Sequence, residues 1–176
     1  MKRRVLALVL VLLLAGMLTS CGLQVPRPEI KEGRFDFSIT YQIGEEVETF
    51  SAVYVCEFAG TSLSVEVLSY NRDWEDHTEG EYEYEGDDYA ATVGKTADGG
   101  DIILFFGVYP EYFMGDSTGD RGAPEPSIYV VYPEDEDGAI ATVGTPEEVE
   151  ALYGAKIISS EYAAPVVNTF TVFDFN

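Results

Sequence analysis

Cys21 is the first residue whose chemistry can be read from its surroundings, because it is one of two cysteines and follows the short stretch Leu18-Thr19-Ser20. A cysteine thiolate is the side chain best suited to alkylation. The small residues before Cys21 leave room for a peptidase to reach the preceding peptide bond. These residue types and their spacing make Cys21 the first candidate for covalent chemistry in the chain.

An export signal is indicated before Cys21. Lys2, Arg3 and Arg4 precede the apolar run "VLALVLVLLLAGML", which is shorter than the ~20 residues that a membrane-spanning helix needs. The ending "LTSC" resembles a bacterial lipobox. That resemblance implies cleavage before Cys21 and attachment of diacylglycerol to its thiol, with acyl chains such as palmitate. The alternative is an ordinary secreted protein with an incidental cysteine.

The resemblance divides the chain into a signal peptide (1–20), a lipidated N-terminus with a tether (21–34) and an extracytoplasmic β-domain (35–176). Two or three acyl chains would anchor the mature protein to the cell membrane without spanning it. We expect the protein to lie on the extracytoplasmic face of the cell membrane. If the host has an outer membrane, we expect the protein to be sorted there, because Gly22 rather than Asp follows the cysteine.

The charge of the chain restricts its partners. The formal net charge is −22, and loss of three basic residues with the signal leaves −25. Such a surface repels nucleic acid and anionic headgroups and attracts cations or basic proteins. With 23 aromatic residues the chain is expected to fold rather than to form an acidic disordered tail.

Catalytic residues are few. His77 is the only histidine, and it lies among acidic residues, but no serine stands in a G-x-S-x-G elbow. A small hydrolase is therefore kept only as an alternative. Cys56 lies in the alternating run "AVYVCEF", where a free cysteine is expected to pack as a small apolar residue.

Metal and cofactor sites are weakly indicated. One histidine and one buried cysteine cannot form a zinc site, and no cofactor is expected. Calcium binds carboxylate and carbonyl oxygens, and the first candidates are Asp116 and Asp120 in "MGDSTGDRG". Other acidic turns contain Asp98 and Asp101. None of these matches the calcium loop of an EF-hand.

Aromatic residues in predicted loops are the stronger candidates for partner binding, because loop aromatics bury much area at low entropic cost. They form two groups: Trp74, Tyr82 and Tyr84 in an acidic segment, and Tyr109, Tyr112 and Phe113 in "GVYPEYFMGD". The competing interpretation is that these rings close one end of the core.

The elements that must position these residues follow from periodicity. Alternation of apolar and polar residues predicts strands; we place them at 35–43, 47–58, 61–70, 88–95, 101–109, 127–132, 155–162 and 166–175. The segments 71–88 and 110–126 are expected to be loops. Thr145, Pro146 and Glu148 form a capping signal for one short helix over 146–153 that ends at Gly154.

The predicted fold is mostly β: a single antiparallel β-sandwich or open barrel with one short α-helix near 146–153. The stretches 145–162 and 112–116 resemble the small acidic lipoproteins of Gram-positive bacteria, a loose likeness that implies no activity. The sequence predicts a membrane-tethered, non-enzymatic binding module for an envelope protein or a cationic partner. The alternatives to this binding module are an acidic blocker of a basic envelope or host enzyme and a small hydrolase.

Overall fold

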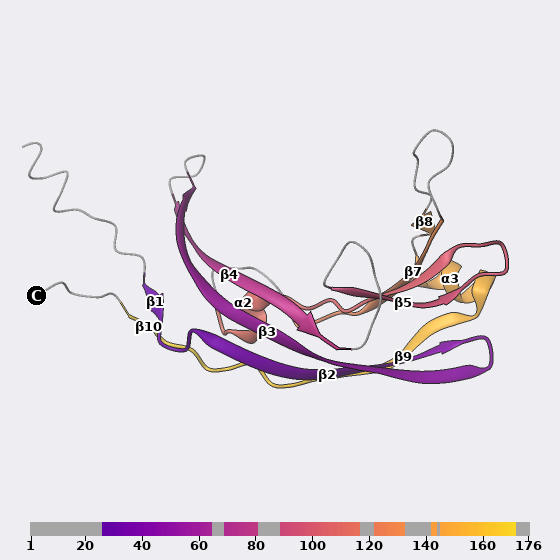
Figure 1. Cartoon of the computed structure of the whole chain (residues 1–176), viewed down its shortest axis with the longest axis horizontal. Helices are drawn as coiled ribbons and strands as arrows, with labels where there is room; N and C mark the ends of the chain where they lie inside the picture. The colour runs from indigo at the N-terminus through magenta and orange to yellow at the C-terminus, as the bar shows by residue number, and fades with distance from the viewer. Residues whose placement is uncertain are drawn as a thin grey trace, which may run out of the picture.

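A computed structural model describes residues 26–64, 69–80, 89–116, 122–132, 142–143 and 145–171. In these ranges the chain forms two four-stranded antiparallel sheets, a two-stranded sheet and two short helices. The predicted fold class, mostly β with antiparallel layers and a helix near 146–153, is confirmed. Figure 1 shows β5 and β7 above β2 and β9 toward one end of the long axis, with β3 and β4 continuing toward the other end.

The first sheet has the order β4-β3-β2-β9 and the second the order β5-β6-β7-β8. The strands of the first are β2 Glu32–Ile43, β3 Glu46–Ser64, β4 Ser69–Glu79 and β9 Ala155–Tyr162. Those of the second are β5 Ala90–Lys95, β6 Asp101–Phe105, β7 Ser127–Val131 and β8 Thr142–Val143. The small sheet pairs β1 Arg27–Pro28 with β10 Phe170–Thr171.

The core lies between the two large sheets, where period-two alternation sends one face of β2 and β3 inward. Phe35, Phe37, Ile39 and Tyr41 are at most 6% exposed, as the sequence predicts. The rings of Phe37 and Phe50 pack on Phe106, which follows β6, with centroids 5.3 and 4.7 Å away. This apolar layer leaves the alternate residues of both strands on the opposite face.

The helix α3, Pro146–Tyr153, forms as its capping signal predicts. The Thr145 side chain accepts a hydrogen bond from the Glu148 amide, and the Glu148 carboxylate accepts one from the Thr145 amide. Val149 is fully buried, in a cluster with Val130 and Ala155. Gly154 ends the helix at φ 64°, a left-handed conformation that other residues rarely adopt. The helix thereby closes the end of the molecule where β7 and β9 meet.

The prediction that residues 71–88 form a loop is wrong over its first half, because β4 occupies Ser69–Glu79 and pairs with β3. Likewise β3 continues past Phe58 to Ser64, so the predicted strand at 61–70 is divided between two strands. Polar residues fill the inward positions of β4, where Asp76 is opposite Cys56 and Arg72 is opposite Thr61. Hydrophobic periodicity is therefore weak, although β4 pairs with β3 on both sides of a register shift between Phe58 and Gly60.

Two further segments differ from expectation. The helix α2, Pro110–Phe113, lies in the predicted loop 110–126. The predicted strand 166–175 is represented by β10, while Val167 is 91% exposed and residues 172–176 lie outside the described ranges. Parts of the expected tether 21–34 are also in strands, namely β1 and the first residues of β2.

Candidate functional site

The outer face of the first sheet carries the polar residues that the core excludes. Arg34, Asp36 and Ser38 alternate with the buried residues of β2, and Ser51 and Val53 do so on β3. The register places Asp36 beside Val53 and Ser38 beside Ser51. Alternation therefore gathers carboxylate, hydroxyl and small apolar groups on one solvent-facing surface.

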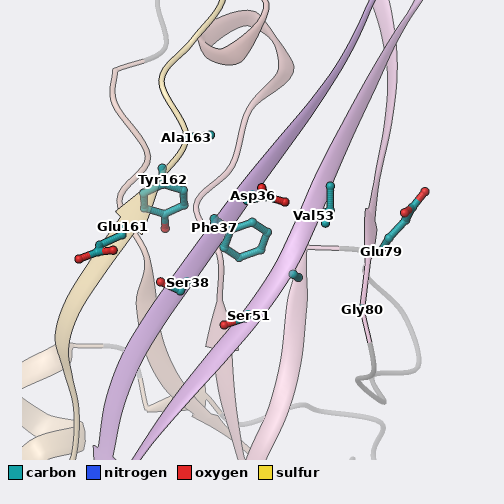
Figure 2. A pocket seen from close by; sticks show the side chains of 11 residues that line it. Asp36, Phe37, Ser38, Ser51, Val53, Glu79, Gly80, Glu161, Tyr162 and Ala163 are labelled. Atoms are coloured by element: carbon teal, nitrogen blue, oxygen red, sulfur yellow. The ribbon is translucent and has the colours of Figure 1, made fainter.

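A groove of about 700 Å³ lies on this surface. We call it the outer-face groove; it is lined by Asp36, Phe37, Ser38, Ser51, Ala52, Val53, Glu79, Gly80, Glu161, Tyr162 and Ala163. Figure 2 shows Asp36, Glu79 and Glu161 on three different strands, with the hydroxyls of Ser38 and Ser51 between them. The register explains part of this grouping, since Glu161 is opposite Ser38 and Glu79 is opposite Val53.

The three carboxylates of the groove differ in their partners. Arg34 donates two hydrogen bonds to Glu79, at 3.0 and 2.5 Å, and this pairing lowers the pKa of Glu79. Asp36 and Glu161 make no side-chain hydrogen bond or ion pair with any residue that the structure describes. The groove therefore holds two carboxylates that no hydrogen bond or ion pair occupies, although Arg34 also attracts Asp36 electrostatically. This arrangement is suited to a positively charged group.

His77 does not form a catalytic triad with the residues that the structure describes. It lies on β4 opposite Val55, with its side chain 49% exposed. Its Nε2 atom is 3.6 Å from Glu79, which is itself held by Arg34. Within the described ranges, no hydrogen bond joins His77 to a serine, threonine or cysteine side chain.

The predicted binding aromatics separate in the structure. Phe113 is fully buried and belongs to the core, which agrees with the competing interpretation that this ring closes one end of the core. Tyr112 meets the Phe113 ring edge-on at 5.1 Å, and Trp74 packs edge-on against Phe58 at 5.4 Å. Tyr109 is half-buried before α2. Tyr82 and Tyr84 lie outside the described residues.

Asp116, the first calcium candidate, is instead paired with an arginine. Its side chain is 0% exposed and accepts hydrogen bonds from Arg72 Nε at 2.7 Å and Arg72 Nη2 at 2.5 Å. The Trp74 indole donates a third at 3.1 Å. Because both oxygens are used in this way, the arrangement corrects the assignment of Asp116 as a metal ligand. Asp120 lies outside the described residues.

Gly115 allows Asp116 to reach this buried position. It has φ 63°, and a Cβ atom there would lie 2.6 Å from the Val166 carbonyl oxygen. The neighbouring Val166 amide donates to the Phe113 carbonyl at 2.9 Å. The segment after β9 is thus held directly against α2, beside the Arg72–Asp116 pair.

The other chemistry-bearing residues have structural partners. Tyr132 donates to Asp98 at 2.8 Å, and Lys95 pairs with Asp101 at 2.6 Å. Within the described ranges, no group of three or more His, Cys, Asp or Glu residues is placed to hold a metal ion. Cys56 is fully buried, as predicted, and burial raises the pKa of its thiol to about 12. Cys21 precedes the first described residue.

Sequence reasoning missed the outer-face groove, although the alternation that builds it was recognised. The signal was present in the polar positions of 35–43 and 47–58, but the pairing of Glu79 and Glu161 with these strands is a long-range feature. Arg72 was also missed, since a lone arginine in an acidic segment is expected to be exposed.

No helix in the described part of the chain has the length and apolar character needed to cross a membrane. Comparisons with protein-family models, with curated proteins and with solved structures find no match for this chain.

Proposed function

We propose that this protein is a lipoprotein, tethered through Cys21 to the extracytoplasmic face of a membrane, that binds a positively charged partner in the outer-face groove. The tether follows from the charged, apolar and small residues that precede Cys21. Two acyl chains bind a bilayer far more strongly than one, since each buried CH₂ contributes about 0.8 kcal/mol. In this proposal the protein has no catalytic role.

The observation that carries the binding proposal is the pair of unpartnered carboxylates, Asp36 and Glu161, at a groove with hydroxyl and apolar lining. A lysine or arginine side chain could place its cationic head between these carboxylates. The apolar stem of that side chain would then lie against Val53. The negative charge of the whole chain would increase the rate of encounter with a basic partner.

The groove can be tested with a peptide of eight lysines and the isotope-labelled fragment 26–176, followed by heteronuclear NMR at low salt. We expect the largest amide shifts at residues 36–38, 51–53 and 161–163. The double variant Asp36→Asn/Glu161→Gln should weaken binding by roughly five- to tenfold, because exposed charge pairs contribute modestly. Raising the salt to physiological strength should weaken binding further.

A matched control removes the same charge elsewhere. The double variant Glu45→Gln/Glu46→Gln changes two exposed residues at the turn between β2 and β3. It should reduce the affinity clearly less than the groove variant does. Equal losses in the two variants, or shifts spread evenly over the surface, would show that the peptide senses only net charge and would overturn the groove assignment.

A further inference from the structure

The N-terminal segment that leads to the anchor is fixed to the body of the protein. β1 pairs with β10, and the Glu29 amide donates to the Thr169 carbonyl at 2.9 Å. The Asn168 side chain accepts from the Ile30 amide at 3.0 Å and donates to the Ile30 carbonyl at 2.8 Å. Pro28 is fully buried. Residues 26–31 are therefore held along the C-terminal segment rather than extending freely as a tether.

The buried ion pair described above strengthens this attachment. Arg72 donates from Nη1 to the Pro26 carbonyl at 3.5 Å, and its guanidinium lies 4.2 Å from the centre of the Phe170 ring. The same guanidinium is bound to Asp116. One side chain thus contacts the N-terminal segment, the C-terminal segment and the residue that follows α2.

Little chain remains between the fixed segment and Cys21. Only residues 22–25 separate Cys21 from Pro26, so the two Cα atoms are at most about 18 Å apart. By comparison, the twelve residues of β2 extend over about 36 Å. β2 starts beside the fixed segment at Glu32 and ends at Ile43, which pairs with Ala155 just after α3. The tether of residues 22–25 is thus shorter than β2, which runs from the β1–β10 end of the molecule to the α3 end.

We propose that the protein is held upright on the membrane, with the β1–β10 end beside the bilayer and the α3 end directed away from it. Figure 1 shows these two features at opposite ends of the long axis. The inference rests on the lipid anchor proposed for Cys21. The negative charge of the body opposes a flat arrangement on an anionic bilayer.

This orientation restricts the partner proposed for the groove. Asp36 and Ser38 lie about 13–20 Å along β2 from Glu32. The groove is therefore held near the middle of the upright body rather than at its distal end. A fitting partner is a basic segment of another membrane-bound protein, or of one that works at the membrane surface.

Energy transfer from tryptophan to dansyl-labelled lipid headgroups can test the orientation. The mature chain from Cys21 is coupled through its thiol to maleimide-headgroup lipid in vesicles of phosphatidylcholine and anionic phosphatidylglycerol. Cys56 is fully buried and does not compete. Trp74, the only tryptophan, lies at the level of Lys31, because its pairing partner Phe58 donates to the Lys31 carbonyl. We expect several-fold stronger transfer from Trp74 than from the indole of Trp74→Phe/Leu152→Trp, since Leu152 is an exposed residue of α3.

Two controls keep the test decisive. Leu152→Trp alone leaves Trp74 and its hydrogen bond to Asp116 in place, and it should lower the mean transfer per tryptophan. Insertion of fifteen Gly/Ser residues after Cys21 should abolish the difference, since such a linker spans about 20 Å on average and allows tumbling. Equal transfer from both positions with the native tether would overturn the orientation. Because the lipid is attached chemically, this result does not depend on whether the host lipidates Cys21 or on whether the groove binds a cation.

Discussion

At the residue level, the Arg72–Asp116 pair shows how a polar group can replace apolar packing in a small domain. The side chains are 7% and 0% exposed, and three hydrogen bonds reach the Asp116 carboxylate. Removing two charges from water is costly, and their attraction compensates only when the geometry is good. The pair is therefore expected to matter most when one partner is lost, because the other then remains buried and uncompensated.

Asp116→Ala is expected to destabilise the fold by about 3–5 kcal/mol, because it leaves the Arg72 guanidinium buried without its counter-ion. The double change Arg72→Met/Asp116→Leu should recover much of this loss. Urea unfolding followed by circular dichroism would measure both. Arg34→Met is a suitable control, since it breaks the exposed Arg34–Glu79 pair and should cost much less. Similar costs for Asp116→Ala and Arg34→Met would contradict the role given to the buried pair.

Apolar residues were easier to assign from the sequence than polar ones. Phe35, Ile39 and Cys56 were placed in the core because each occupies an apolar position in an alternating run. Arg72 and Asp116 could not be placed, since their burial depends on each other and they are 44 residues apart in the sequence. The sequence leaves Phe113 undecided between a surface contact and the core for a related reason, because its loop contains a helical turn that directs the ring into the core.

At the level of elements, local signals gave the reliable predictions. α3 was predicted with its boundaries, because its cap, its proline and its terminal glycine are all within ten residues. β4 was not, because most of its inward positions carry polar residues whose partners lie on other elements. The partner of Asp76 is the Tyr54 hydroxyl on β3, and that of Arg72 is Asp116. Periodicity reports burial of apolar residues, so a strand with polar inward residues has no comparable signal.

The ends of α3 provide a direct test of the local signals. Thr145→Ala should destabilise the protein by about 1 kcal/mol, because the Glu148 amide loses its acceptor. Gly154→Ala should cost about 1 kcal/mol or more, because φ is 64° and the new Cβ would lie 3.3 Å from Gly44. Thermal unfolding and hydrogen exchange of the α3 amides would measure both effects. Glu147→Ala, one residue before the capping glutamate, is the matched control. Should it destabilise α3 as much as Thr145→Ala, the capping box would not explain the helix.

For the whole molecule, the sequence predicted the class of fold and the sign of the charge, but not how the two chain ends are arranged. The Ile30–Asn168 hydrogen bonds join residues 138 positions apart, and β1 and β10 are only two residues long. Segments this short carry no periodic signal of their own. They are ordered because the folded body brings them together. The same pairing turns an expected free tether into a fixed attachment point at one end of the molecule.

The anchor itself gives the prediction for the whole molecule. In a Gram-positive host that expresses residues 1–176, the wild-type chain should incorporate labelled palmitate and fractionate with the membrane. Cys21→Ser, expressed behind a secretory signal whose cleavage does not require the cysteine, should abolish both properties, because without acyl chains a body with a formal charge of −25 has no affinity for an anionic membrane. Cys56→Ala is the matched control and should retain both, since that thiol is buried in the core. If Cys21→Ser remained in the membrane fraction, another segment would have to hold the protein there, and the upright orientation would lose its cause. If it were released but still bound octalysine, tethering and groove binding would be separate properties of one chain.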